Sequence, residues 1–168
     1  MFAVVNTDLR WGIGMENRLL VTIRADLQRF RRLTEGKTVI LGRKTLETFP
    51  SGKPLKNRRN LVLSRDPSFR VEGAECFRDL PSLLAALPKS TEDIAVIGGA
   101  SVYEALLPYC ERVCLTRTLV TLPADRFFPD LDRLPDWTEE ARSEVLEENG
   151  TRFQYIDYVN RSPIMLSP

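Results

Sequence analysis

The sequence lacks histidine entirely and contains only three cysteines among its 168 residues. The absence of histidine excludes a Ser-His-Asp triad, a Cys-His dyad and a histidine-ligated zinc site within this chain. Cys76, Cys110 and Cys114 are too few for a disulfide framework or for a complete thiolate metal site. We therefore expect no metal, and we expect the cysteines to be buried free thiols of a protein in a reducing compartment.

The sequence also lacks a long apolar run and an excess of charge of one sign. No apolar run approaches the ~20 residues that a membrane-spanning helix needs. The first residues, 1–6, resemble a strand rather than the basic and cleavable start of a secretion signal, so we expect a cytoplasmic protein. The net charge of +1 argues against nucleic acid or an anionic membrane as the main partner. Without a heptad pattern, the default expectation is a monomer.

The length and composition are those of one globular domain. A chain of 168 residues with 43% apolar and 28% charged residues can bury roughly two-thirds of its unfolded surface. We expect residues 1–160 to form the domain and residues 161–168 to form a short C-terminal tail.

Short apolar runs alternate with helical patterns over the first two-thirds of the chain. This alternation predicts an α/β fold with a twisted, mostly parallel sheet and flanking helices. The predicted strands are residues 2–6, 38–41, 60–63, 75–77, 94–97 and 113–118. The predicted helices are residues 24–34, 43–48, 80–87 and 101–107.

The last third of the chain has a different pattern. Residues 139–146 and 152–159 alternate polar and apolar side chains, and Asn149-Gly150 between them is a turn signal. This pattern predicts a C-terminal antiparallel hairpin at the edge of the sheet. Residues 122–137 contain three prolines and four aspartates, and we expect them to form a packed loop.

One carboxylate, Asp26, lies in an otherwise apolar and basic helical stretch. On a helix, Leu27, Phe30 and Leu33 are expected to face the interior, with Asp26 at the edge of the buried face. A carboxylate there costs free energy unless it is paired or hydrogen-bonded, which indicates a functional site. The alternative is that Asp26 only complements the dipole at the helix N-terminus.

Two junctions between a strand and a helix carry glycine: Gly98-Gly99 after strand 94–97, and Gly42 after strand 38–41. Glycine lets a phosphate or a ring approach the backbone, and the following helix offers unpaired N–H groups. For each glycine taken alone, a tight turn is the better interpretation. Neither junction matches the P-loop or the Rossmann fingerprint, and Gly12-Ile13-Gly14 is expected to lie in a long loop.

Positive charge surrounds the second junction. Arg43 and Lys44 lie at a helix start, where cations are unfavourable unless an anion is bound there. Ser64 and Arg65 follow the next strand. Together these residues predict a site for a nucleotide with more than one phosphate group.

The order of these motifs resembles the dihydrofolate reductase family across nearly the whole chain. The segments that carry the resemblance are Trp11-Gly12-Ile13-Gly14 with Asn17, Ala25-Asp26-Leu27 with Phe30, Val39-Ile40-Leu41-Gly42-Arg43-Lys44-Thr45, Lys53-Pro54-Leu55-Lys56-Asn57-Arg58 with Asn60, Val96-Ile97-Gly98-Gly99 with Tyr103, Leu115-Thr116, and Phe127-Phe128-Pro129. Each motif is short, but their order and spacing together are specific.

The resemblance implies reduction of 7,8-dihydrofolate to tetrahydrofolate with NADPH, by hydride transfer to pterin C6 and protonation at N5. Asp26 would bind the 2-amino group and N3–H of the pterin, and Thr116 would support Asp26; these two are the implied catalytic residues. In a chain without histidine, Asp26 is also the residue expected to set the pH profile.

The resemblance further implies a substrate pocket. Arg58 would bind the glutamate tail, for which a planar guanidinium is well suited. The apolar lining around the ring and the aminobenzoyl group would come from Leu27, Phe30, Phe49, Leu55 and Ile97. For Phe49 and Leu55, ordinary core packing is an equally good interpretation.

The implied NADPH site uses the two glycine junctions. Its pyrophosphate would lie against Arg43, Lys44, Thr45, Gly98, Gly99 and Ala100, and its 2′-phosphate against Arg43, Ser64 and Arg65. Asn6, Ile13 and Gly14 would border the nicotinamide. The remaining candidates are Gly42, Ser101, Val102 and Tyr103. The loop of residues 9–22 would act as a mobile lid.

The chain departs from the family pattern at three places. Leu20-Val21 replaces a frequent Pro-Trp, Arg24 replaces Pro, and Ala100 replaces a third glycine. Two other functions remain open at this point. One is a riboflavin-pathway pyrimidine reductase of the same fold, whose substrate has no glutamate tail for Arg58. The other is a non-catalytic NADPH-binding module.

Overall fold

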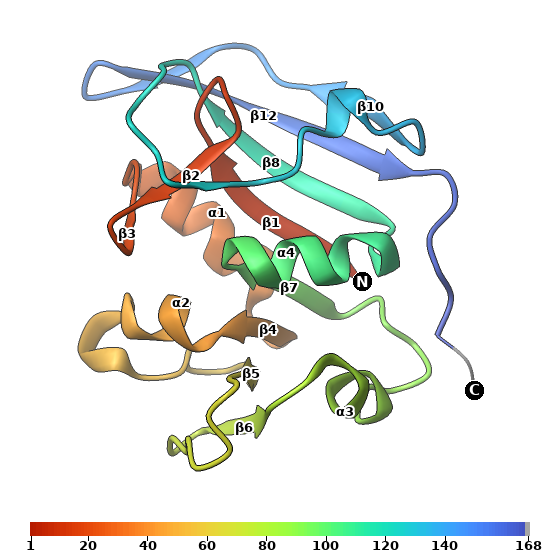
Figure 1. The fold of residues 1–168 in the computed structure, drawn as a ribbon. Helices are drawn as coiled ribbons and strands as arrows, with labels where there is room; N and C mark the ends of the chain where they lie inside the picture. Colours follow the sequence, from red (N-terminus) through yellow and green to blue (C-terminus); the bar gives the residue numbers. More distant parts are fainter. Residues whose placement is uncertain (167–168) are drawn as a thin grey trace.

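A nine-stranded sheet forms the centre of residues 1–166, the part of the chain that the computed structural model describes (Figure 1). Its strands follow the order β10-β12-β8-β1-β7-β4-β5-β6, and β11 pairs with β12. The bounds are β1 (Phe2–Thr7), β4 (Thr38–Gly42), β5 (Arg59–Leu63), β6 (Ala74–Phe77), β7 (Ile94–Gly98), β8 (Arg112–Thr118), β10 (Trp137–Arg142), β11 (Leu146–Glu148) and β12 (Thr151–Asn160).

The strands from β8 to β6 are mutually parallel, whereas β10, β11 and β12 pair antiparallel. The α/β fold with a C-terminal antiparallel hairpin is therefore confirmed. Every residue of β7 is buried, as expected for a parallel strand covered on both faces. A strand covered on both faces has apolar side chains on both faces, so it appears in the sequence as a continuous apolar run, such as Ile94–Gly98, without alternating polar residues.

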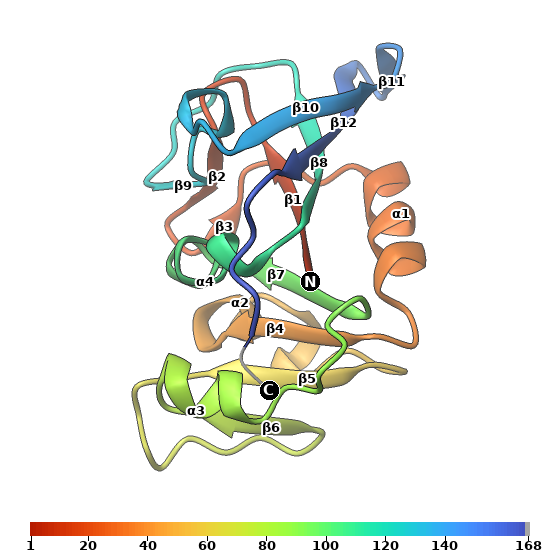
Figure 2. The same ribbon diagram turned by 90° about the vertical axis from the view of Figure 1, so that its right-hand side faces the viewer.

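Helices cover both faces of the sheet (Figure 2). Helix α1 (Arg24–Thr34) lies on one face, and α4 (Ala100–Leu106) lies on the other. Side chains from α2 (Arg43–Glu47) join the core on the α1 face, and those from α3 (Leu80–Ala85) join the core on the α4 face. Three short 3-10 turns complete the elements: η1 (Pro50–Gly52), η2 (Leu107–Tyr109) and η3 (Leu131–Arg133).

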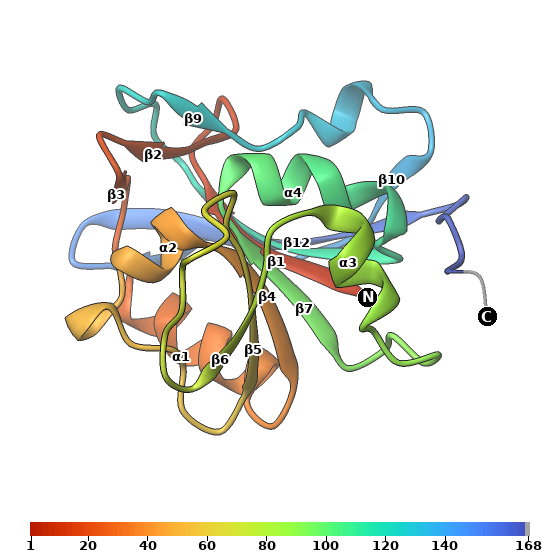
Figure 3. The same cartoon turned by 60° about the horizontal axis from the view of Figure 1, so that its bottom comes forward.

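The predicted loops 9–22 and 122–137 are in part a second, three-stranded sheet. It contains β2 (Gly12–Met15), β3 (Arg18–Leu19) and β9 (Arg126–Phe127) in the order β3-β2-β9. The expectation that Gly12-Ile13-Gly14 lies in a loop is therefore wrong. The pairing of β2 with β9 joins segments more than 100 residues apart, so no local pattern could reveal it. Figure 3 shows β2, β3 and α2 on the same side of the molecule.

Asp8 fixes the start of this second sheet. Its buried carboxylate accepts hydrogen bonds from the backbone N–H groups of Arg10 at 2.9 Å, Gly12 at 2.8 Å and Leu122 at 3.0 Å. Since three donors satisfy the carboxylate, its burial is tolerated. Asp8 thereby joins the segment after β1 to the segment after β8.

The first arm of the terminal hairpin is not the continuous strand predicted for residues 139–146. It consists of β10 and β11, with a register irregularity between Glu139 and Ala141. Between the two strands, the Ser143 hydroxyl accepts a hydrogen bond from the Tyr155 N–H at 2.9 Å. A side chain thus replaces part of the ladder. Residues 161–166 contain no helix or strand, and residues 167 and 168 of the predicted tail lie outside the described residues.

All three cysteines are free thiols. Cys110 and Cys114 are buried as expected, whereas Cys76 is only half-buried. Burial raises the pKa of Cys110 to about 12, so this thiol stays neutral. In residues 1–166, no helix is long and apolar enough to cross a membrane.

Candidate active site

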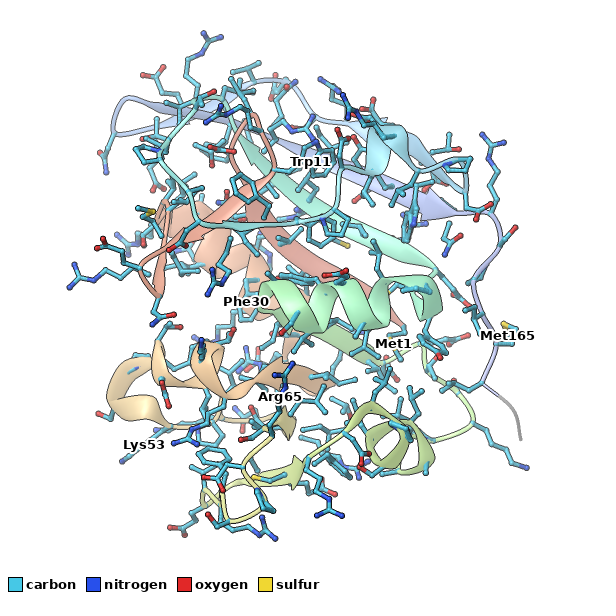
Figure 4. All side chains as sticks on the ribbon, in the orientation of Figure 1. Met1, Trp11, Phe30, Lys53, Arg65 and Met165 are labelled. Atoms are coloured by element: carbon cyan, nitrogen blue, oxygen red, sulfur yellow. The ribbon has the colours of Figure 1, made fainter. Side chains whose placement is uncertain are left out.

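A cavity of about 1050 Å³ opens at the carboxyl ends of the parallel strands. This edge of an open α/β sheet is where ligands commonly bind. The wall includes the ends of β1, β4, β5 and β7, together with β2, α1 and α4. In Figure 4, Trp11, which precedes β2, and Arg65, which follows β5, lie on opposite sides of α4. The residues that line the cavity range from Val4 to Arg126, so it is assembled from segments far apart in the sequence.

Asp26 lies on the cavity wall and is already hydrogen-bonded. The Thr116 hydroxyl donates to its Oδ1 at 2.5 Å, and the Asn6 amide donates to its Oδ2 at 3.0 Å. The Thr118 hydroxyl in turn donates to the Asn6 side-chain oxygen at 2.8 Å. Because both donors to Asp26 come from the central strands β1 and β8, the carboxylate is fixed relative to the sheet. A role limited to the helix dipole does not explain this network.

Asn6 makes a contact that was not inferred from the sequence. It lies on the cavity wall, and its amide donates a hydrogen bond to Asp26. Asn6 therefore helps to hold the Asp26 carboxylate, in addition to any contact it makes with a ligand. β1 and β8 are paired with Asn6 opposite Thr116. That register could not be read from the sequence, because it depends on which strands are neighbours.

Glu148 is a residue that sequence reasoning missed. Ile23 precedes α1 and offers no capping side chain. Instead, the Glu148 carboxylate, from β11, accepts hydrogen bonds from the N–H groups of Arg24 at 2.6 Å and Ala25 at 3.0 Å. A carboxylate at this end satisfies otherwise unpaired donors and complements the helix dipole. The helix that carries Asp26 therefore begins at a position fixed by the C-terminal hairpin.

The apolar wall of the cavity includes Leu27, Phe30, Phe49 and Ile97. Leu27 is 50% exposed, so the expectation that it faces the interior is wrong. On the α1 face that the hydrophobic pattern predicted to be buried, Leu27 lines the cavity instead of packing in the core. Leu55 is not on this wall; it packs against the core on the α1 face, as its alternative interpretation held.

Arg58 also lies off the cavity wall. Its Nε donates to the Thr34 hydroxyl at 3.0 Å, and its Nη1 donates to the Lys56 carbonyl at 2.6 Å. Burial lowers the pKa of Arg58 below its usual value, although a guanidinium remains charged near neutrality. Two hydrogen bonds thus hold the side chain in place.

The two glycine junctions pack against each other's helices. A Cβ on Gly42 would lie 3.2 Å from Cγ2 of Val102, and a Cβ on Gly99 would lie 3.2 Å from Oγ1 of Thr45. Gly98 has a φ of 121°, which side chains with a Cβ rarely adopt. The two junctions can therefore pack this closely only because these positions are glycine.

All of the residues inferred for the cofactor lie on the wall of this one cavity. They are Asn6, Ile13, Gly14, Gly42, Arg43, Lys44, Thr45, Ser64, Arg65, Gly98, Gly99, Ala100, Ser101, Val102 and Tyr103. The Tyr103 hydroxyl donates to the Val4 carbonyl at 2.6 Å, and burial raises its pKa. Tyr103 therefore shapes the wall rather than offering its hydroxyl to a ligand.

Arg43 is not the uncompensated cation that the sequence indicated. Its Nε donates to Glu47 at 3.1 Å and its Nη1 to Asp66 at 3.4 Å. Glu47 is one helical turn away and Asp66 follows β5, so neither pairing is evident from the positions next to Arg43. With two glycine junctions on its wall and Arg43, Lys44 and Arg65 around them, this part of the cavity fits a phosphorylated dinucleotide.

Comparison with known proteins agrees with this geometry. The family model for dihydrofolate reductase matches residues 1–160. Dihydrofolate reductase of Neisseria meningitidis serogroup B is 36% identical over 148 residues, which cover 88% of this chain and 90% of the relative. Dihydrofolate reductase type 3 of Salmonella typhimurium is 40% identical over 131 residues, which cover 78% of each chain.

A solved structure agrees as well. The dihydrofolate reductase of Enterococcus faecalis, complexed with NADP(H) and RAB-propyl, superposes with a TM-score of 0.84 at 30% identity and covers 95% of each chain. These similarities agree with a cavity that has Asp26 at one end and the two glycine junctions at the other. The chain belongs to the dihydrofolate reductase family.

Proposed function

We propose that this chain reduces 7,8-dihydrofolate to 5,6,7,8-tetrahydrofolate with NADPH as the reductant. The observation that carries the proposal is the Asp26 carboxylate, held by Asn6 and Thr116 on the wall of the cavity that the two glycine junctions also line. This arrangement supplies an anionic anchor for one ligand and a cationic, backbone-lined cleft for another. A reductase that brings two rings together needs both.

Asp26 binds and orients the pterin in this proposal. Its oxygens accept hydrogen bonds from the 2-amino group and from N3–H, which fixes the ring in its plane. Because Thr116 and Asn6 already donate to the carboxylate, its oxygens do not have to be reoriented when substrate binds. The proton that N5 acquires comes from water, and Asp26 favours this protonation by its negative charge.

The rest of the substrate extends away from Asp26 along α1. Leu27, Phe30 and Phe49 provide apolar contact for the ring and the aminobenzoyl group. Arg58 binds a carboxylate of the glutamate tail. This remote contact fixes the substrate without touching the reacting atoms, so it contributes to affinity more than to the chemical step.

The cofactor half of the cavity would hold NADPH, which would supply the hydride for pterin C6. Gly42, Gly98 and Gly99 let the backbone approach the pyrophosphate, and Arg43, Ser64 and Arg65 face the 2′-phosphate. Ile13 and Gly14 in β2 cover the nicotinamide and exclude water. Residues 9–22 form the lid over this part of the site.

The test is the loss of reduced-nicotinamide absorbance when purified protein is mixed with NADPH and dihydrofolate, with NADH in parallel. We expect turnover that depends on dihydrofolate and is faster with NADPH. NADPH binding without turnover would contradict the proposal in favour of a non-catalytic module. Turnover of a ribosylaminopyrimidine instead would favour the riboflavin-pathway reaction.

We further propose that residues 1–160 act as one catalytic domain, that the protein works as a monomer in the cytoplasm, and that neither nucleic acid nor membrane is a partner. Sedimentation at the concentration of the activity assay tests the oligomeric state. A stable dimer under those conditions would contradict it.

A further inference from the structure

Asp66 places a carboxylate among the cations of the cofactor cleft. It follows Ser64 and Arg65 at the end of β5 and lies on the cavity wall. Its Oδ2 accepts a hydrogen bond from Arg43 Nη1 at 3.4 Å. Arg43, Ser64 and Arg65 are the residues assigned to the 2′-phosphate of NADPH. The negative carboxylate of Asp66 therefore lies beside the proposed position of the negative 2′-phosphate.

The carboxylate of Asp66 is fixed rather than free to swing away. Its Oδ1 accepts hydrogen bonds from the Ser68 N–H at 2.9 Å and from the Ser68 hydroxyl at 2.7 Å. The Asp66 N–H donates to the Ser64 hydroxyl at 3.3 Å. The bonds from Ser68, followed by the charge of Arg43, hold the pKa of Asp66 below its usual value, so the group stays ionised near neutrality.

The Arg43 guanidinium is held from several directions. Besides Asp66, Glu47 accepts a bond from its Nε at 3.1 Å, and its central carbon lies 4.5 Å from the centre of the Phe69 ring. Its Nη1 edge is therefore already engaged by Asp66. A phosphate that approaches Arg43 has to share or replace the Asp66 carboxylate.

The consequence differs for the two nicotinamide cofactors. A 2′-phosphate is repelled by a carboxylate held beside the same guanidinium, whereas a free 2′-hydroxyl can donate a hydrogen bond to that carboxylate. We infer that Asp66 is a specificity-determining residue that narrows the preference of this site for NADPH over NADH. The inference rests on the proposed function, because it assumes that the cleft binds the adenosine part of a nicotinamide cofactor.

Direct binding separates this inference from catalysis. Isothermal titration calorimetry would measure the affinities of 2′,5′-ADP and 5′-ADP for the wild type and for Asp66→Asn. Asparagine keeps an oxygen for the bond from Ser68 but removes the charge. We expect the ratio of the two affinities to shift about fivefold toward 2′,5′-ADP, as removal of one nearby like charge at a solvated site allows, and the shift to shrink at 0.5 M salt.

Glu47→Gln is the matched control. It removes the other carboxylate that pairs with Arg43, but Glu47 does not lie on the cavity wall. We expect the ratio to change less than about twofold in this variant, because its charge is farther from the ligand. The ratio of kcat/KM for NADPH to kcat/KM for NADH should likewise change more in Asp66→Asn than in Glu47→Gln. The KM for dihydrofolate should stay unchanged in both variants.

The outcomes distinguish the inference from the proposed function. If both adenosine diphosphates bind and Asp66→Asn leaves their ratio unchanged, or if Glu47→Gln shifts it as much, the specificity role is overturned and the reductase function is unaffected. If neither compound binds the wild type although the protein is folded, the assignment of the cleft fails and both proposals are overturned.

Discussion

The two ends of the cavity hold their charged groups in opposite ways. At the substrate end, Asp26 is bound by Thr116, which is 2% exposed, and by Asn6 from the central sheet. At the cofactor end, Arg43 forms ion pairs with Glu47 and Asp66, whose side chains are 60% and 45% exposed. Hydrogen bonds to a charged group contribute about 1.5–3 kcal/mol each, whereas exposed ion pairs contribute about 0–1 kcal/mol.

This difference matches what each end has to do. The carboxylate that orients a reacting ring must keep its geometry through the reaction, so it is fixed by hydrogen bonds from the central sheet before a ligand arrives. The cations that meet a phosphate must change partners when the cofactor binds and leaves, and weak exposed pairs allow that exchange. Substitutions at the substrate end should therefore alter turnover, and those at the cofactor end should alter affinity and selectivity.

The largest effect is expected for Asp26→Asn. The neutral amide removes the negative charge and places an N–H₂ group beside Asn6 or Thr116, both of which donate to this side chain. We expect turnover to fall roughly 10²–10³-fold, with the NADPH dissociation constant unchanged within about twofold. Single-turnover kinetics and fluorescence titration measure the two quantities. A turnover within tenfold of the wild type would remove Asp26 from its role.

Arg58→Ala should have the next largest effect, and on a different quantity. Loss of a guanidinium that binds the substrate tail removes about 1.5–3 kcal/mol, which corresponds to an increase in the KM for dihydrofolate of roughly 10–100-fold, with kcat almost unchanged. Arg59→Ala is the control, because the neighbouring Arg59 is exposed and pairs with Glu75 at 2.7 Å. An equal rise of KM in both variants would mean that the effect is one of general charge.

Thr116→Val tests whether the buried support of Asp26 matters by itself. The variant keeps the shape of the side chain but cannot donate to Asp26. Loss of one hydrogen bond to a charged group predicts a decrease in kcat/KM of about tenfold. Thr118→Val removes the bond to Asn6 instead and should have a smaller effect, since it acts through one more residue. Thr116→Ser should restore most of the activity; if it does not, packing rather than the hydroxyl is responsible.

The hydrophobic pattern of adjacent residues predicted those helices and strands that depend on adjacent residues alone. The buried strand β7 and helix α1, whose bounds Arg24–Thr34 agree with the prediction, each carry their signal in adjacent residues. β2, β9 and the division of the hairpin at Ser143 were missed because they depend on pairing between distant segments. The sequence indicates which segments form strands, whereas these features depend on which strands lie side by side in the folded protein.

The same distinction applies to the site. Asp26 was identifiable as a carboxylate in an apolar helix, and the resemblance to a family supplied Thr116. The bonds that join Asn6 to Asp26, Arg24 to Glu148 and Arg43 to Asp66 each link residues at least 20 positions apart, and no motif marks them. Arg43 could be identified as a cation at a helix start, but its neutralisation by Asp66 could not.

The smallest effect is expected for Glu148→Ala, which tests whether the substrate end depends on the C-terminal hairpin. Removing the carboxylate leaves the N–H groups of Arg24 and Ala25 without their partner, so we expect the free energy of unfolding to fall by about 1 kcal/mol. Urea denaturation measures this. Because α1 also carries Asp26, the KM for dihydrofolate should rise about twofold to threefold while NADPH affinity stays the same. Glu147→Ala, on the exposed neighbour, is the control; if NADPH affinity falls with Glu148→Ala, the two ends of the cavity are coupled and the distinction between them fails.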